Sequence, residues 1–367
     1  MGAGISKTER LMSIDALRGF DMLLIIFADR FFISLGRAAD TPVTDFLATQ
    51  FDHPEWLGFH IYDIIMPLFL FVVGAVIPFS IDKRLKQNPS ISSLYRHLLK
   101  RFVVLFILGA ICQGHLLSLD ITKLHFFSNT LQAIAVGYLF SSIAYIHLSK
   151  KGRYILFAGL LVVYAILLSF PNVPGLGQSE LLPDRSFALY VDHLILGRFD
   201  DGTQYSWILT GLGFTATVLS GLFAGELIRS SLAREKVALY LLLIGVISLA
   251  LGLIWGIWHP IVKKLWTSSF VLFLAGICYI LLAAFYWIID VKGYRKWAYP
   301  LKVIGMNAIS VYVASHVISF PKIADFILFG LEQYVGSYYD VITSIGGFGI
   351  MYLILWYMYK NNTFIKV

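Results

Sequence analysis

Charged side chains are scarce in this sequence of 367 residues, and cysteine is scarcer still. Only 14% of the residues are Asp, Glu, Lys or Arg, whereas soluble proteins carry about 25%. Because 58% of the chain is apolar and arranged in many long runs, this composition excludes an ordinary soluble enzyme and indicates a polytopic membrane protein. The two cysteines, Cys112 and Cys278, lie far apart in apolar runs, which argues against a disulfide or a metal site.

Several motifs of common enzyme classes are also missing. The chain has no GxxxxGK[ST], no HExxH and no GxSxG stretch, so nothing indicates P-loop nucleotide hydrolysis, zinc proteolysis or serine-hydrolase chemistry. We expect the protein to work without a metal.

The long apolar runs predict an all-α integral membrane protein with about ten transmembrane helices, forming a single membrane domain over residues 1–367. The expected spans cover residues 14–34, 61–81, 98–114, 128–147, 153–171, 207–228, 237–258, 266–289, 299–318 and 341–360. A turn-rich external loop is expected at about 172–206, with a short helix at SFALYVDHLIL; loops of this length are usually functional. Residues 321–335 are too few and too polar to span the membrane, so we expect them to form an amphipathic helix at its outer surface.

The net charge of +7 follows membrane topology and requires no nucleic-acid partner. Twenty of the 29 Lys and Arg residues fall in loops on one side of the expected spans, eight fall on the other side, and Arg18 lies inside the first span. By the positive-inside rule, both termini are cytoplasmic. This orientation places the stretch QFDHPEWLGFHIYD, residues 50–63, at the external side.

Three ionisable residues at the external side are candidates for catalysis. His53 suits a general base because the ordinary pKa of histidine lies near 6.5, although a surface-loop histidine is the plainer interpretation. Asp63 is either a carboxylate at the membrane surface or the partner that orients His53. Asp29 lies at the outer end of the first span.

Three further residues are candidates for substrate binding. Trp56 is either a stacking surface for a sugar ring or a member of the interfacial aromatic belt. His316 adds a second imidazole near the outer end of a span. Asn307 is a polar residue inside the same span, where an interhelical hydrogen bond is the alternative role.

Three arginines are placed at the inner level, in or next to the first and third spans. Arg10, Arg18 and Arg101 form a candidate anion site, because a guanidinium offers a fork of donors that suits phosphate groups. A local ladder of ion pairs between Arg18 and its neighbours Asp15 and Asp21, three residues away on either side, is the alternative.

Six stretches in order resemble one family, the transmembrane heparan-α-glucosaminide N-acetyltransferases and their bacterial homologues. They run from residue 10 to about residue 318 and read RLMSIDALRGFDM; HPEWLGFHIYDIIMPLFLFVVGAVIPFSI, which is similar to H-x-x-W-x-G followed by D-x-x-x-P-x-F; TLQAIAVGYLF; VDHLILG; KKLWTSSFVLFLAG; and DVKGYRKW with YPLKVIGMNAISVYVASHVI. The resemblance implies a bacterial homologue that lacks the amino-terminal luminal domain of the animal lysosomal member.

The resemblance also implies an activity. The family transfers acetyl from cytosolic acetyl-CoA to the terminal glucosamine amine of a heparan-type glycosaminoglycan across the membrane, so acetyl-CoA is the expected co-substrate and an amino sugar the expected acceptor. His53 matches the family's catalytic histidine. Asp29 departs from an active-site asparagine of the lysosomal member, and a D-P-E-G stretch of many relatives is missing before residue 207.

The sequence alone leaves other functions open. An amino-sugar transporter, an O-acetyltransferase acting on another saccharide and a structural membrane scaffold are the alternatives. We expect a multi-pass protein of the bacterial inner (plasma) membrane, in contact with lipid, with the active site open to the periplasm and a homodimer as one possible assembly.

Overall fold

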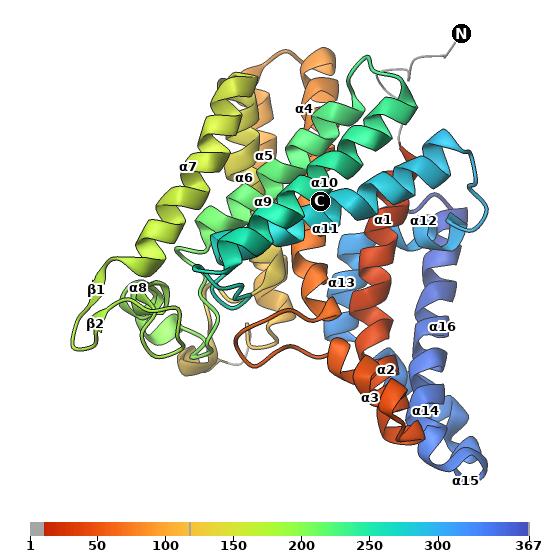
Figure 1. The fold of residues 1–367 in the computed structure, drawn as a ribbon. Coiled ribbons are helices and arrows are strands. Elements are labelled where there is room, and N and C mark those ends of the chain that lie inside the picture. The colour runs from red at the N-terminus through yellow and green to blue at the C-terminus, as the bar shows by residue number, and fades with distance from the viewer. Residues whose placement is uncertain (1–10, 117–118, 366–367) are drawn as a thin grey trace.

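The computed structural model describes residues 11–116 and 119–365, and most of them are helical (Figure 1). Within these residues, the sheet structure is one short antiparallel pair, β1 (Asn172–Val173) with β2 (Gly177–Gln178). The helices are α1 (Met12–Leu23), α2 (Asp29–Ala39), α3 (Pro42–Gln50), α4 (Ile65–Gln87), α5 (Ile91–Cys112), α6 (Thr130–His147), α7 (Lys150–Ser169), α8 (Phe187–Leu196), α9 (Gly211–Ile228), α10 (Arg234–Gly256), α11 (Ser268–Tyr286), α12 (Tyr299–Gly305), α13 (Ala308–Val317), α14 (Phe320–Leu328), α15 (Glu332–Val335) and α16 (Tyr339–Lys360).

Short polar side chains begin several of the long helices. The Ser90 hydroxyl accepts the backbone N–H of Ser93 before α5, and the Asn129 side chain accepts the N–H of Leu131 before α6. These bonds satisfy donors that the first helical turn leaves unpaired. The apolar runs that follow supply the length and hydropathy of the helices.

The long helices cross the molecule between two ends (Figure 1). The loops after α4, α6 and α9 lie at one end, and α3, α8 and the β1–β2 hairpin lie at the other. This alternation agrees with the Lys and Arg distribution in the sequence. Which end faces the cytoplasm stays a prediction.

Six helical segments of the described residues are long and apolar enough to cross a membrane. They are Ile61–Gln87, Lys150–Ser169, Gly211–Ile228, Arg234–Gly256, Ser268–Val291 and Phe320–Lys360. The other expected spans are also helical, but charges interrupt the first of them, and the span expected at 299–318 breaks between α12 and α13 at Met306–Asn307. A multi-pass helical protein is therefore supported, and the count of about ten crossings stays a prediction.

Both segments expected to form short helices outside the bundle are helical. The stretch SFALYVDHLIL becomes α8, which lies beside the β1–β2 hairpin, and residues 321–335 form α14 and α15 (Figure 1). The membrane contact expected for the second segment stays a prediction.

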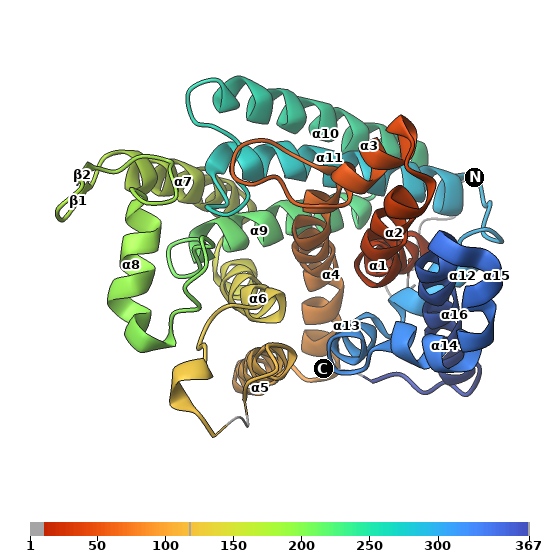
Figure 2. The same ribbon diagram turned by 90° about the horizontal axis from the view of Figure 1, so that it is seen from below.

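Helix α4 lies near the centre of the bundle, with α9 and α6 on one side and α1 and α13 on the other (Figure 2). Glycines allow α9 to approach it closely. A Cβ atom added at Gly221 would lie 1.9 Å from the backbone oxygen of Phe71, and one added at Gly74 would lie 2.0 Å from that of Val218. Small residues permit this backbone contact, as in other membrane helix pairs, and they fix α4 in place.

Helices α1 and α2 are joined without a loop. A π-helical turn at Leu24–Ala28 connects them, and such turns change the direction in which the following side chains point. Asp29, the first residue of α2, lies directly after this turn. The turn therefore sets the orientation of a predicted catalytic residue.

Candidate active site

A cavity of about 690 Å³ opens at the end of the bundle that holds α3 and the start of α4. We name it the histidine cavity, because His53 and His316 both line it. Its wall comes from the π turn after α1, the first residues of α2, the starts of α4 and α6, and parts of α13, α14 and α16. The end of the long loop before α9, at residues 201–207, and Lys263 from the loop before α11 complete it.

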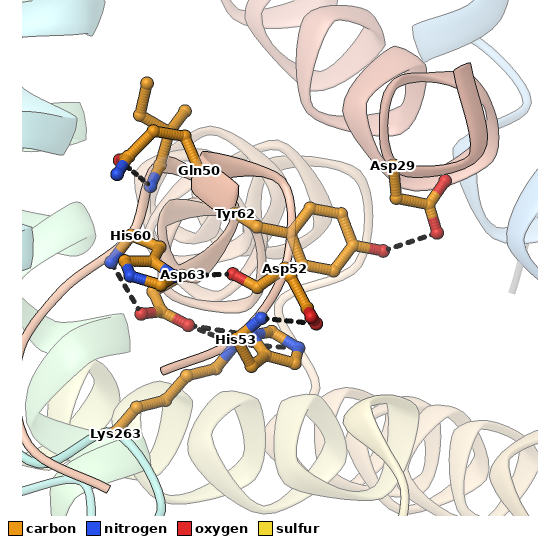
Figure 3. Close-up of polar contacts among 9 residues, drawn as sticks. Asp29, Gln50, Asp52, His53, His60, Tyr62, Asp63 and Lys263 are labelled. Atoms are coloured by element: carbon orange, nitrogen blue, oxygen red, sulfur yellow. Dashed lines mark hydrogen bonds and ion pairs between the residues drawn. The ribbon is translucent and has the colours of Figure 1, made fainter. Parts of the chain in front are cut away.

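His53 and Asp63 form a hydrogen-bonded pair at this cavity (Figure 3). His53 Nδ1 lies 2.8 Å from Asp63 Oδ1. The His53 side chain is 36% exposed, whereas the Asp63 side chain is 0% exposed. Of the two interpretations of Asp63 from the sequence, the structure supports the partner that orients His53.

The loop before α4 folds around the Asp63 carboxylate. The backbone N–H of His60 donates to Asp63 Oδ2 at 3.0 Å, and the His60 ring Nδ1 bonds to the backbone oxygen of Asp52 at 2.9 Å. The Asp52 side chain in turn accepts the backbone N–H of His53 at 2.8 Å. These local bonds hold the imidazole and the carboxylate in a fixed relation.

Lys263 completes the cluster from a distant part of the chain (Figure 3). Its Nζ lies 3.0 Å from Asp63 Oδ1 and 3.1 Å from His53 Nδ1. Burial lowers the pKa of Lys263, and the Asp63 carboxylate opposes this shift. A buried cation beside a buried carboxylate keeps the pair close to neutral, which avoids the cost of a lone charge.

We assign the neutral His53 tautomer with the proton on Nδ1. In this tautomer Nδ1–H donates to Asp63, and Lys263 donates to the same carboxylate. Nε2 then carries the ring lone pair, and Lys263 Nζ lies 3.5 Å from it. An imidazole in this state can accept a proton from a bound molecule.

Tyr62 connects the His53 cluster to Asp29 (Figure 3). The Tyr62 hydroxyl donates to Asp29 Oδ2 at 3.1 Å, and the Tyr62 and His53 rings lie 5.0 Å apart. All three line the histidine cavity. His316 lines it too, with Nδ1 bonded to the backbone oxygen of Tyr312 at 2.8 Å. The structure therefore brings four of the residues predicted from the sequence, His53, Asp63, Asp29 and His316, to this cavity or to the cluster beside it.

Two predicted substrate contacts do not line this cavity. The Trp56 ring N–H donates to the backbone oxygen of Leu181 at 2.7 Å, so Trp56 fastens the long loop before α8 to the start of α4. Asn307 is buried, and its side chain bonds to backbone atoms of Thr363 and Ile365. Interhelical or tail contacts explain Asn307 better than sugar binding does.

A second, smaller cavity of about 190 Å³ contains Arg18 and Arg101, and we name it the arginine cavity. The Arg101 guanidinium lies 4.3 Å from the centre of the Tyr138 ring, and among the described residues its buried Nε has no hydrogen-bond partner. Arg18 lies 3.8 Å from the Asp15 carboxylate, which is one of the two pairs of the ion-pair alternative. Both buried carboxylate oxygens of Asp21 lack a hydrogen-bond partner among the described residues. Arg10 lies outside the described residues.

The donor set of the arginine cavity fits an anionic group such as a phosphate. An unpartnered buried guanidinium N–H is costly unless a ligand accepts it. The volume of the cavity admits only part of a large cofactor. Among the described residues, no three His, Cys, Asp or Glu side chains gather as metal ligands would.

Lys263 and Tyr62 are members of the site that the sequence analysis missed. Lys263 lies in KKLWTSSF, part of one of the six stretches that resemble the family, and it is one of the few cations expected on the external side. Either feature could have indicated a role at the site. Tyr62 directly precedes Asp63. Neither signal indicated a contact with His53 or Asp29.

Comparisons with known proteins agree with the motifs. Residues 10–176 match the family model of a domain of unknown function, DUF5009. Heparan-alpha-glucosaminide N-acetyltransferase from Homo sapiens is 25% identical over 375 aligned residues, covering 84% of this chain and 53% of that protein. The Mus musculus protein of the same name is 23% identical over 435 residues, covering 99% of this chain and 61% of that protein. The chain thus spans little more than half the length of these relatives. The chain is thus distantly similar to the heparan-alpha-glucosaminide N-acetyltransferases over most of its length.

Proposed function

We propose that the protein is a transmembrane acetyltransferase. It moves acetyl from cytosolic acetyl-CoA to the amine of a terminal glucosamine, in a heparan- or heparin-type saccharide, on the periplasmic side of the inner membrane. The names of the two relatives support an acyl transfer to such an amine. The observation that carries the proposal is the His53–Asp63 pair at the histidine cavity.

His53 acts as the general base. Its Nε2 removes a proton from the acceptor amine while the nitrogen bonds to the acetyl carbon, and His53 returns that proton to the departing sulfur. A positioned base contributes about 10²–10⁴-fold, or roughly 3–5 kcal/mol of barrier. Asp63 holds the tautomer that this step requires, and Lys263 balances the charge of Asp63.

Asp29 and His316 bind the acceptor in the histidine cavity. The Asp29 carboxylate, already held by Tyr62, is placed to accept hydrogen bonds from the amino group and hydroxyls of a sugar. This role differs from that of the amide found at this position in the lysosomal member, because an ionised carboxylate cannot donate. His316 keeps a free Nε2, since its Nδ1 is bonded within α13.

Arg18 and Arg101 hold the anionic part of acetyl-CoA at the arginine cavity, with Arg10 as a predicted third contact. Acetyl-CoA supplies an acetyl group already activated as a thioester. Holding both substrates in one protein should contribute more to the rate than the base does. A ping-pong route through acetylated His53 is the rival mechanism, and labelled acetyl-CoA without acceptor would trap such an intermediate.

The test uses purified protein in detergent with acetyl-CoA and a heparin disaccharide bearing a free amine. We expect acceptor-dependent CoA release and an acetylated sugar, both lost in His53→Ala. His193→Ala is the matched control, because this histidine lies on α8 with its side chain 65% exposed and does not line the cavity.

Other outcomes select the alternatives. Release with hydroxyl acceptors alone would indicate an O-acetyltransferase. Failure to bind acetyl-CoA at all would refute the transferase and favour an amino-sugar transporter, for which Arg101→Ala should leave uptake unchanged.

A further inference from the structure

One face of α4 lines both cavities. Ile65 and Met66 line the histidine cavity, Val73 and Ile77 line the arginine cavity, and Phe69 lines both. Their positions follow the spacing of three and four residues that keeps side chains on one helix face. From Ile65 to Ile77 this face extends roughly 18 Å at 1.5 Å per residue.

Helix α13 repeats the pattern beside α4. Ala308 and Ile309 line the arginine cavity, while Tyr312, Ser315 and His316 line the histidine cavity. These positions again lie on one face, three or four residues apart. Two neighbouring helices thus present one continuous face each to the two cavities in succession.

Helix α1 and the π turn after it also contribute side chains to both cavities. Arg18 lines the arginine cavity and Ile25 lines the histidine cavity. Met22 lies between them in the chain, is fully buried and belongs to the same apolar cluster as Phe69. The two cavities therefore follow one another along the same three helices, on either side of the level of Met22 and Phe69.

Phe69 is the single residue, among those the structure describes, that lines both cavities. Its side chain is only 3% exposed overall. It is also the Phe of the recognised D-x-x-x-P-x-F stretch that begins at Asp63. Neither catalysis nor packing of the α4–α9 contact has so far required it.

We propose that Phe69 is the partition of a continuous path between the donor and acceptor sites. This inference rests on the proposed acetyl transfer. In the state described here, the apolar ring separates the two cavities and keeps water on the acceptor side away from the donor. Displacement of the ring admits a long, thin acyl thioester arm from the arginine cavity to His53.

Loss of the partition has a defined chemical consequence. Water in place of the amine attacks the thioester carbonyl, and the carbon–sulfur bond breaks. One proton of the water goes to the departing sulfur to give the CoA thiol, and the other is released when acetic acid ionises to acetate. Exclusion of water is a recognised means of suppressing this side reaction. The ring of Phe69 therefore acts on the ratio of transfer to hydrolysis.

The first test measures the path without using the reaction. Ile309→Cys, in a background of Cys112→Ala and Cys278→Ala, places one thiol in the arginine cavity. A membrane-impermeant thiol reagent is applied to each side of sealed vesicles in turn. We expect labelling from one side only with Phe69 present, and from both sides with Phe69→Ala.

The second test measures the reaction. Phe69→Ala should raise acceptor-independent hydrolysis of acetyl-CoA by about tenfold or more, and Phe69→Trp should abolish transfer while acetyl-CoA still binds. If the alanine variant folds poorly, Phe69→Leu takes its place, and we expect a smaller rise in hydrolysis. Phe71→Ala is the matched control, because Phe71 is fully buried in α4 and lines neither cavity.

The outcomes are distinct. Labelling of the thiol from both sides with Phe69 present, or from one side only after Phe69→Ala, would overturn the partition. Equal hydrolysis in the Phe69 and Phe71 variants would do the same. A partition seen by labelling in a protein that binds no acetyl-CoA would keep the path and refute the transferase instead.

Discussion

Asp63→Asn is the substitution that tests the architecture of the site most directly. The Asp63 carboxylate accepts from His53 Nδ1 at 2.8 Å, from the backbone of His60 at 3.0 Å and from Lys263 at 3.0 Å. An amide of the same shape can accept at one atom only and presents two N–H donors at the other. With its NH2 group toward His53, the amide holds the imidazole proton on Nε2, where no proton can be accepted. With its oxygen toward His53, its NH2 group faces the His60 N–H and that bond is lost.

Two effects of different size follow. Losing the base should lower kcat by about 10²–10⁴-fold, as expected when an imidazole is held in the wrong tautomer. Removing the carboxylate also leaves Lys263 as a buried cation without its ion-pair partner, which costs about 3–5 kcal/mol of stability. Activity and thermal stability should fall together.

A second substitution separates these effects. Lys263→Met removes the unpaired charge, so the double variant Asp63→Asn with Lys263→Met should regain thermal stability without regaining kcat. The assay is acceptor-dependent CoA release at saturating substrate, with thermal unfolding in the same detergent. Recovery of full activity in the double variant, or a loss of less than about tenfold in Asp63→Asn, would contradict the role assigned to the pair.

Three other expectations concern binding, packing and pH. Arg101→Leu should weaken acetyl-CoA binding about 10–100-fold in calorimetry, which corresponds to the loss of one charge-assisted contact. Lys100→Leu is the control, because Lys100 is exposed, and equal effects of the two substitutions would show that Arg101 does not hold the ligand. Gly221→Ala should lower stability by about 1–3 kcal/mol, because its Cβ would lie 1.9 Å from a carbonyl oxygen of α4, whereas Gly159→Ala, which meets nothing within 4 Å, should cost nothing in a melting experiment. Burial lowers the pKa of His259 from 6.5 to about 4, so the stability that its neutral form contributes is complete above about pH 6.5 and is lost as the pH falls toward 4. His259→Gln should reduce the change in unfolding free energy between these pH values by up to about 3 kcal/mol. An unchanged pH profile of unfolding would contradict this.

The residues that carry local signals were predictable. Apolar runs predicted the helices, including α8 within the long loop, because length and periodicity are properties of a short window. The stretch HPEW followed by D-x-x-x-P-x-F gave His53 and Asp63 as candidates, and the two residues lie only ten positions apart in the chain. The spacing of Arg18 and Asp15 gave their ion pair as an alternative to anion binding, and the pair is present.

The misplaced residues show where local signals stop. Asn307 is polar inside an apolar run, which signals a partner but not its identity, and the partner is the backbone of residues 363 and 365. Trp56 is aromatic near a membrane surface, and its partner Leu181 lies 125 residues away. A polar residue announces that it needs a hydrogen bond, but only the packing of distant segments chooses which one.

The sequence by itself indicated the helical membrane class, the similarity to the acetyltransferase family and the candidate histidine His53, because each depends on composition or on a short ordered pattern. Tertiary structure alone decided that Lys263, 210 residues from His53, shares the Asp63 carboxylate with it. It also decided that Tyr62 reaches Asp29 and that Phe69 lines both cavities. These contacts arise only after the helices have packed, with the distance between α4 and α9 set by glycines. Buried charges must then pair with the groups that the packing places beside them. That requirement acts on the folded molecule and leaves no periodic trace in the chain.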